Sequence, residues 1–189
     1  MKTLTKNTLL LTCSLLLLSA SCKKTKTGLA ALPPATQEGK NTFGCLINGK
    51  AFVAQSKPFT TPPVPAVTCK YGYIDDDISK GHNFSLYGSD NKVLQKPDAP
   101  SAVLLCVNKI DIQEGATYQL KDQKDNGAYA DYHTYLLIHD YTSLTGELTI
   151  TKFDEINGIA SGTFWFDTKN EQGEKIEIRD GRFDAKINQ

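Results

Sequence analysis

The sequence predicts an all-β protein: a single antiparallel β-sandwich or barrel-like domain that follows a signal peptide and a flexible tether. Short apolar runs, rich in β-branched and aromatic residues, alternate with turn residues along most of the chain. No apolar pattern with the period of a helix, about 3.6 residues, runs long enough to form a core helix. Such a chain buries its apolar side by packing one sheet on another or by closing a sheet on itself.

The most regular stretch, residues 146–187, has the pattern of a β-meander. Its apolar runs are separated by Asn157-Gly158, Gln172-Gly173 and Asp180-Gly181. Glycine adopts positive φ without strain, and Asn or Asp beside it tolerates the same geometry. We therefore expect a turn at each of these three positions.

Further strands are expected before this meander. Residues 42–47 and 50–54 are apolar runs joined by Asn48-Gly49, which is the strongest short signal for a hairpin. Residues 102–107 form a continuous apolar run, typical of a strand buried on both faces. Residues 129–139, rich in Tyr, are the longest unbroken strand candidate.

The first 21 residues have the features of an export signal. Lys2 and Lys6 supply positive charge, and residues 9–18 supply an apolar run before a group of small residues. A run of this length is too short to cross a bilayer, which requires about 20 residues in a helix. We therefore predict that residues 1–21 are a lipoprotein signal peptide, removed from the mature protein.

Cys22 is the predicted site of lipid attachment. The stretch Leu18-Ser19-Ala20-Ser21-Cys22 resembles the lipobox of bacterial lipoproteins, in which small residues lead to a lipid-modified cysteine at the mature N-terminus. Ser19 stands where that motif usually has Leu. The resemblance implies acyl chains such as palmitate on Cys22, and hence attachment to a membrane. The alternative is secretion without lipid, because Ser19 and Ser21 also satisfy the small-residue rule of ordinary signal peptidase.

Residues 22–41 are predicted to be a flexible tether, since they contain Pro33-Pro34, small residues and no apolar period. They carry four Lys against one acidic residue. Residues 42–189, the predicted all-β globular domain, carry 15 Lys and Arg against 20 Asp and Glu, a net charge of −5. An acidic domain argues against nucleic acid as a partner, because non-specific binding to nucleic acid depends on a basic surface.

Three cysteines, Cys45, Cys69 and Cys106, fall within the predicted globular domain. An odd number leaves at least one thiol unpaired. Cys45 and Cys106 also lie in apolar runs, where a free cysteine packs as a small apolar residue. We expect three reduced, buried thiols; the alternative is one disulfide and one free thiol.

Motifs for catalysis or metal binding are absent from the sequence. In a strand over residues 131–140, Asp131, His133 and His139 share a face, but the two histidines are about 20 Å apart and cannot hold one metal ion. Asp131 and His133 are enough for half of a metal site only, and the other half would have to come from another strand. The alternative is that they form the polar side of a half-solvated strand. We therefore predict no metal site, no cofactor and no catalytic residues. The alternative is an enzyme whose site is recognised by geometry rather than by a sequence motif.

Trp165, the single tryptophan of the chain, is the candidate binding residue. Alternation along a strand places Phe164 and Phe166 on one face and Thr163 and Trp165 on the other. The phenylalanine face is the better core, which leaves an amphipathic indole ring beside hydroxyl groups, suited to a protein or carbohydrate ligand. In the alternative, the proline-rich segment 57–67 or the tether folds over this face and buries the ring.

The chain resembles a family of uncharacterised lipoproteins of the Bacteroidota. The resemblance rests on the lipobox, Asn48-Gly49-Lys50, Ser161-Gly162-Thr163-Phe164 and Asp180-Gly181-Arg182-Phe183-Asp184. It implies attachment to the outer membrane, and it carries no assigned activity. We therefore expect a lipid-anchored protein of the cell envelope that acts as a non-catalytic binding or structural module. The alternative is a small envelope enzyme or inhibitor.

Overall fold

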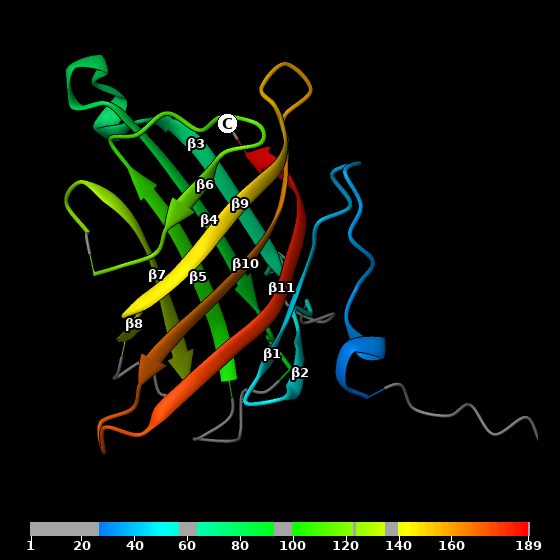
Figure 1. The fold of residues 1–189 in the computed structure, drawn as a ribbon. Helices are drawn as coiled ribbons and strands as arrows, with labels where there is room; N and C mark the ends of the chain where they lie inside the picture. The colour runs from blue at the N-terminus through cyan, green and yellow to red at the C-terminus, as the bar shows by residue number, and fades with distance from the viewer. Residues whose placement is uncertain (1–26, 57–63, 93–99, 123, 135–139, 189) are drawn as a thin grey trace, which may run out of the picture.

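The computed structural model describes residues 27–56, 64–92, 100–122, 124–134 and 140–188 (Figure 1). These residues form one curled sheet of eleven strands, which confirms the all-β prediction. The strands are β1 (Thr42–Ile47), β2 (Lys50–Val53), β3 (Val67–Tyr73), β4 (His82–Ser89), β5 (Pro100–Asn108), β6 (Thr117–Gln119), β7 (Gly127–Thr134), β8 (Asp140–Thr142), β9 (Thr145–Asp154), β10 (Ile159–Lys169) and β11 (Lys175–Asn188).

The helical elements of the described residues are three short 3-10 turns, η1 (Gly28–Ala31), η2 (Ile74–Asp76) and η3 (Ile78–Lys80). Across the described ranges, no helix has the length and apolar character needed to cross a membrane.

Hydrogen bonds connect the strands in the order β6-β9-β10-β11-β3-β4-β5-β7-β8, and β1 joins β11 with β2 on its outer side. In Figure 1 the layer formed by β9, β10, β11 and β1 lies in front of β3, β4 and β5. One pairing departs from the predicted antiparallel sheet: β3 runs parallel to the end of β11, with Ile187 opposite Cys69. This is possible because β11, at 14 residues, extends beyond the part of its edge that pairs with β1.

The curl brings the β6 end of the sheet to β7, the strand next to the other end. Leu120, which follows β6, forms a bridge with Ala128 of β7. The backbone N–H of Lys121 donates to the carbonyl of Ala128 at 2.9 Å. The architecture is therefore barrel-like: one curled mixed sheet forms a half-barrel.

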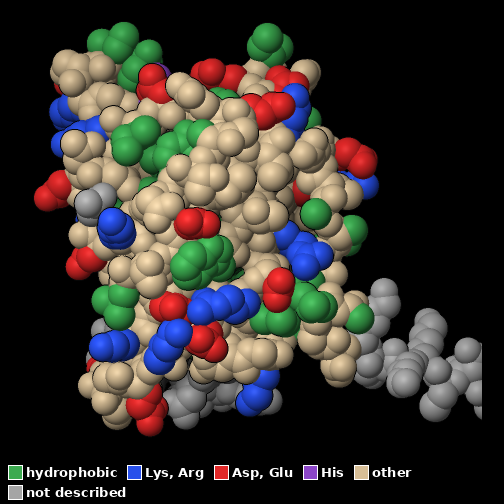
Figure 2. All heavy atoms as spheres, viewed as in Figure 1, with side chains coloured by type: hydrophobic (Ala, Val, Ile, Leu, Met, Phe, Trp, Pro, Cys, Tyr) green, Lys and Arg blue, Asp and Glu red, His purple; other side chains and the backbone are tan. Residues whose placement is uncertain are grey.

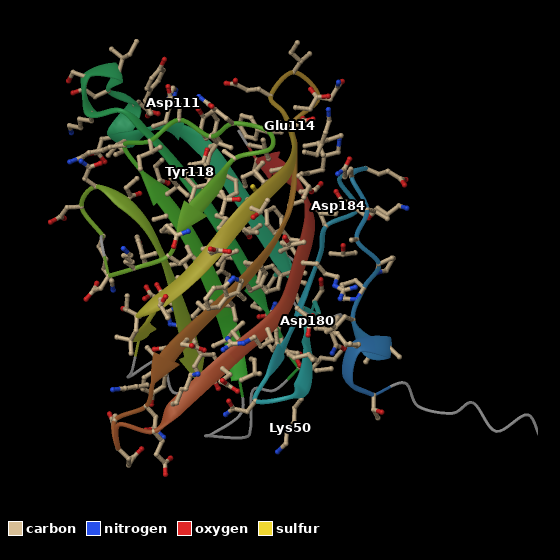
Figure 3. All side chains as sticks on the ribbon, viewed as in Figure 1. Lys50, Asp111, Glu114, Tyr118, Asp180 and Asp184 are labelled. Atoms are coloured by element: carbon tan, nitrogen blue, oxygen red, sulfur yellow. The ribbon has the colours of Figure 1, made fainter. Side chains whose placement is uncertain are left out.

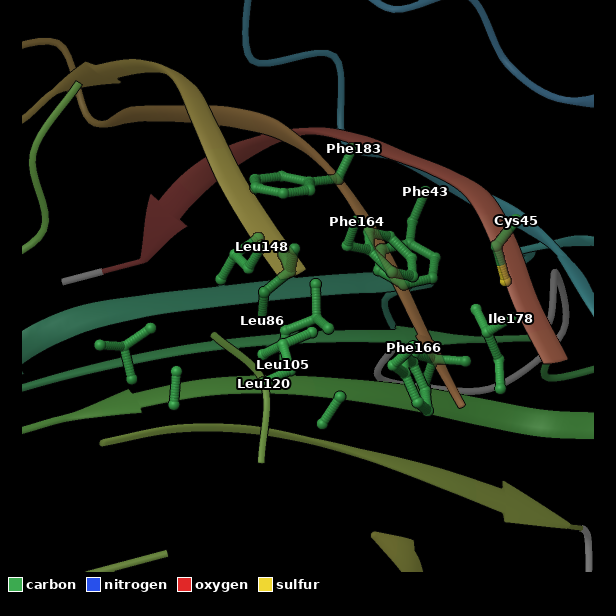
Figure 4. Packing of buried hydrophobic residues seen from close by; sticks show 14 of the residues in the cluster. Phe43, Cys45, Leu86, Leu105, Leu120, Leu148, Phe164, Phe166, Ile178 and Phe183 are labelled. Carbon is green, nitrogen blue, oxygen red and sulfur yellow. The ribbon is translucent and has the colours of Figure 1, made fainter. Parts of the chain in front are cut away.

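A single apolar core fills the inside of the curl (Figure 4). The rings of Phe43 and Phe164 pack with their centroids 5.1 Å apart. Glycine makes room for such rings, since a Cβ at Gly162 would lie 2.8 Å from the ring of Phe183. Aromatic residues from β1, β10 and β11 therefore meet in the centre of the core. Their packing joins the first strand of the sequence to the last two.

Residues 146–187 form the predicted meander, with β9, β10 and β11 antiparallel. The turns at Asn157-Gly158 and Gln172-Gly173 are confirmed, and both glycines have positive φ, 63° and 78°. The prediction of a third turn is wrong, because Asp180-Gly181 lies inside β11. Two residues of β11, Arg179 and Asp180, oppose the one residue Trp165 there, which makes a β-bulge. A bulge and a turn both use positive φ, here 52° at Asp180, so the sequence pattern is the same.

The Asn48-Gly49 hairpin is confirmed, with Ile47 opposite Lys50. The long strand predicted over residues 129–139 is wrong. β7 ends at Thr134, and β8 runs back along it with Asp140 opposite His133. No Gly or Pro marks this reversal in the sequence, which is why the pattern suggested one strand; residues 135–139 lie outside the described residues.

The predicted tether is also wrong in its second half. Residues 32–41, named the strap from here on, lie along β1 and β11 (Figure 1). Leu32 is 8% exposed, and Pro33 is so close to Gly44 that a Cβ there would lie 2.7 Å from Pro33 Cδ. Composition could not show this, because the residues that hold the strap come from distant parts of the chain. The predicted signal peptide, residues 1–21, and the predicted lipid-attachment residue Cys22 lie outside the described residues.

Cys45, Cys69 and Cys106 are free and buried, which confirms the prediction of three reduced thiols. Burial raises the pKa of Cys69 to about 12 and that of Cys106 to about 11. It raises the pKa of Cys45 as well. Thiols that stay protonated at neutral pH are poor nucleophiles, so all three act as packing residues.

Candidate binding site around Trp165

β10 carries large aromatic side chains on both faces. Phe164 and Phe166 point into the core and are 3% and 0% exposed. Trp165 points outward and is half-buried. The predicted alternation is therefore confirmed, and the indole ring lies on the outer face of the β9-β10-β11 sheet.

The bulge in β11 brings a cation to this ring. The guanidinium carbon of Arg179 is 5.3 Å from the centre of the Trp165 ring, within the range of a cation–π contact. Arg179 Nη1 donates to the carbonyl of Phe166 at 3.1 Å, and Nη2 donates to Oδ1 of Asp167 at 2.5 Å. These hydrogen bonds hold the guanidinium against the ring.

An ion-pair network continues from Arg179 along the outer face. Asp167 Oδ2 is 3.2 Å from Nζ of Lys175. Burial on its own raises the pKa of Asp167, but the hydrogen bonds and positive charges of Arg179 and Lys175 outweigh it, and the pKa falls below its ordinary value. Asp167 is therefore ionised at neutral pH, and it neutralises the cation that contacts Trp165.

The polar edge of the indole is held from the other neighbouring strand. Glu147 of β9 lies opposite Trp165, and Trp165 Nε1 donates to Glu147 Oε2 at 3.2 Å. Gln119 of β6 donates to the second oxygen of Glu147, also at 3.2 Å. The ring is thus fixed in orientation by groups from β6, β9 and β11.

A pocket of about 370 Å³ opens beside Trp165. Thr149 and Thr163, which lie opposite each other on β9 and β10, line it together with Arg182 of β11 and Ala35 of the strap. Arg179 does not line this pocket, so the guanidinium and the pocket contact different parts of the ring. Figure 2 shows a hydrophobic group on this face, ringed by acidic and basic side chains.

One buried carboxylate holds the strap beside the pocket. Asp184 of β11 is 0% exposed and lies next to the strap (Figure 3). Its oxygens accept from Thr36 Oγ1 at 2.6 Å and from the backbone N–H of Gly39 at 2.6 Å. The N–H groups of Glu38 and Lys40 and the hydroxyl of Ser161 donate to it as well. Burial on its own raises the pKa of Asp184, but these hydrogen bonds outweigh it and lower the pKa to about 2.

The outcome for Trp165 lies between the two alternatives derived from the sequence. The strap does reach this face, but it supplies a wall of the pocket through Ala35 and leaves the ring half-buried. Most of the proline-rich segment, residues 57–63, lies outside the described residues. The partners Glu147, Arg179 and Asp184 were not predicted, although Asp180-Gly181-Arg182-Phe183-Asp184 already marked this part of β11 as distinctive.

Asp131 and His133 lie on the same face of β7, as predicted, and both are buried. Asp131 Oδ2 is 3.5 Å from Nζ of Lys124. His139 lies outside the described residues. Among the residues that the structure describes, no group of three or more His, Cys, Asp or Glu is arranged to hold a metal ion.

The fold and the site define an all-β domain with an aromatic pocket on the outer face of its sheet. A family model described as a domain of unknown function (DUF6252) matches residues 102–185. The match covers the strands that carry Trp165, Glu147 and Arg182, and it leaves out the strap and β1 to β4. No curated protein and no solved structure matches the chain.

Proposed function

We propose that this protein is a lipid-anchored, non-catalytic binding module of the cell envelope, and that its ligand is a saccharide that stacks on Trp165. The observation that carries the proposal is the Trp165 ring, which Glu147 and Arg179 hold in place beside an open pocket. A ring that is already oriented loses little conformational freedom when a ligand binds.

The chemistry of the pocket suits a sugar. The apolar C–H face of a pyranose packs on an indole ring, and its hydroxyl groups require hydrogen-bond partners around that ring. Thr163 is exposed and Arg182 is half-buried beside Trp165. Thr149 lines the pocket, and its hydroxyl is 2.9 Å from that of Thr117, which fixes the position of the Thr149 hydroxyl. Small-molecule sites combine an apolar surface with a few positioned polar groups in this way.

A binding role fits the charges better than a catalytic role. Both carboxylate oxygens of Glu147 already accept hydrogen bonds, one from Trp165 Nε1 and one from Gln119 Nε2. Asp180 also lines the pocket, so two carboxylates are present as in many glycosidases, but Asp180 is exposed on the bulge. The alternative function, a small envelope enzyme, therefore predicts cleavage of a bound oligosaccharide, which binding alone does not.

The ligand is tested with the natural fluorescence of the protein, because Trp165 is the single tryptophan. The mature chain, residues 22–189, carrying Cys22→Ser is titrated with the hexasaccharides of cellulose, xylan, mannan and starch. We expect at least one of them to shift or quench the emission, and Arg182→Gln to weaken that binding. Thr151→Ala, an exposed change on β9 outside the pocket lining, is the matched control. No response to any of the four sugars contradicts a saccharide ligand, and shorter products in the mixture favour the enzyme.

The anchor is tested through Cys22. Two or more acyl chains anchor a protein stably, since each buried CH₂ group contributes about 0.8 kcal/mol. We expect the wild-type protein in the outer-membrane fraction and in the detergent phase, and the Cys22→Ser variant in neither. A soluble wild-type protein with an unmodified N-terminal mass is the opposite outcome and rules out the lipid.

A further inference from the structure

A second, larger cleft lies on another part of the sheet, over the outer sides of β3, β4 and β5. Its volume is about 580 Å³, which is within the range of about 300 to 1,000 Å³ of small-molecule sites. It shares no lining residue with the Trp165 pocket. In Figure 1, β3, β4 and β5 form the layer behind β9 and β10.

The floor of this cleft is a fixed pair of amides. Asn83 and Asn108 lie opposite each other on β4 and β5, and Asn83 Nδ2 donates to Asn108 Oδ1. Asn108 Nδ2 donates to the carbonyl of Lys124 at 2.5 Å. Gly72 lies opposite Asn83 on β3, and a Cβ there would meet no atom within 4 Å. The floor is therefore open above Gly72, and Asn83 keeps its own carbonyl oxygen and a second N–H for a ligand.

Three lysines surround these amides: Lys70, Lys109 and Lys124. Lys124 is 3.5 Å from Asp131. Lys70 and Lys109 are exposed and form no ion pair with any of the residues that the structure describes. Their positive charge is notable in a domain whose net charge is −5.

The acidic side chains of the cleft offset this charge only in part. Asp75 lines the cleft, but its carboxylate is 2.8 Å from Nζ of Lys80. Asp125 is the other acidic lining residue, and it is exposed. The cleft therefore has two lysine ammonium groups, those of Lys70 and Lys109, that form no ion pair with a described residue. Against them stands one carboxylate in the same condition, that of Asp125.

We propose that this cleft binds the phosphate group of a small phosphorylated molecule, either a soluble sugar phosphate or the headgroup of a lipid. Both arginines of the chain, Arg179 and Arg182, lie on β11, so planar bidentate recognition of a carboxylate is not available in the cleft. Lysines act as point charges that suit a tetrahedral oxyanion. The Asn83 amide serves the hydroxylated part of the ligand.

The test follows the side-chain amide signals of Asn83 and Asn108 by NMR. The mature chain with Cys22→Ser is titrated at low salt with glucose 1-phosphate, glucose and glucuronate. We expect glucose 1-phosphate to shift the two amides, glucuronate to act more weakly and glucose to have no effect. Phosphatidylcholine vesicles with and without phosphatidic acid form the second arm, and binding only to the acidic vesicles assigns the phosphate to a lipid.

Variants separate this site from general charge effects. Lys70→Gln together with Lys109→Gln should weaken binding about ten-fold or more. Lys50→Gln removes an exposed lysine of β2 outside the cleft and should have no effect (Figure 3). Trp165→Ala should also bind phosphate as the parent does, so the outcome is independent of the saccharide proposal. The proposal is overturned if neither phosphate probe binds, if glucuronate binds as tightly, or if the Lys50 variant loses as much affinity.

Discussion

The two faces of β10 place aromatic rings under opposite conditions. Phe164 and Phe166 are held by close packing in the core, where the ring of Phe164 lies 5.1 Å from that of Phe43. Trp165, one residue from each, is held on the outer face by the hydrogen bond that its Nε1 donates to Glu147 and by the guanidinium of Arg179. Packing orders the inner rings without polar partners, whereas the outer ring is ordered by polar partners and keeps part of its surface free for a ligand.

The largest loss of stability is expected when a ring is removed from the face of β10 that points into the core. Phe166→Ala removes a fully buried ring. We expect the free energy of unfolding to fall by about 3 to 5 kcal/mol, because both the transfer of the ring from water and its packing are lost. Chemical denaturation measures this. A loss below about 1 kcal/mol would mean that the inner face is not the core of this sheet.

Next is the carboxylate that holds the strap. Asp184→Asn replaces an acceptor of five N–H and O–H donors by an amide that offers its own N–H groups. We expect a loss of about 2 to 3 kcal/mol, since hydrogen bonds to a buried charge are lost and donors are left unpaired. Proteolysis should then cut within residues 32–41 in the variant and not in the parent. An intact strap in the variant contradicts the role given to Asp184.

The same carboxylate predicts a pH dependence. The pKa of Asp184 is about 2 in the folded protein, against 3.8 for a free side chain. A lowered folded pKa stabilises the protein fully above pH 3.8, and this stabilisation of about 2 kcal/mol is lost as the pH falls from 3.8 toward 2. Thermal unfolding from pH 5 to pH 2 should show a smaller decrease for Asp184→Asn than for the parent. If the unfolding temperatures of the two proteins fall in parallel as the pH is lowered, the lowered pKa of Asp184 is contradicted.

A smaller loss is expected on the outer face. Trp165→Ala should lower the free energy of unfolding by about 1 to 2 kcal/mol, because the Trp165 ring is half-buried whereas that of Phe166 is fully buried. Saccharide binding should be lost completely, as measured by calorimetry. A loss of stability equal to that of Phe166→Ala would mean that Trp165 is a core residue, and that the two faces of β10 do not differ in the way described.

The smallest effect is expected for Glu147→Gln. The glutamine oxygen still accepts from Trp165 Nε1, so stability should change by less than about 0.5 kcal/mol. Glu147→Leu removes the acceptor and should leave the indole N–H without its partner, with a change in Trp fluorescence that the Gln variant does not show. Equal spectra for the two variants would mean that Glu147 does not orient the ring.

Local pattern was sufficient for much of this molecule. The all-β fold, the Asn48-Gly49 hairpin, the meander and the inward Phe164 and Phe166 follow from alternation and turn chemistry, because both act over a few residues. The buried thiols follow in the same way, since Cys45 and Cys106 lie in apolar runs. The outward direction of Trp165 is likewise a property of its own strand.

Contacts between distant residues decided the rest. The strap is ordered because Gly39 and its neighbours bond to Asp184, 145 residues later in the chain. Asp180-Gly181 became a bulge instead of a turn because β10 and β1 pair with β11 on both of its sides. The Trp165 pocket and the cleft beside Asn83 are assembled from strands whose register no single segment encodes. Alternation determines which way a side chain points, and tertiary pairing determines what it meets there.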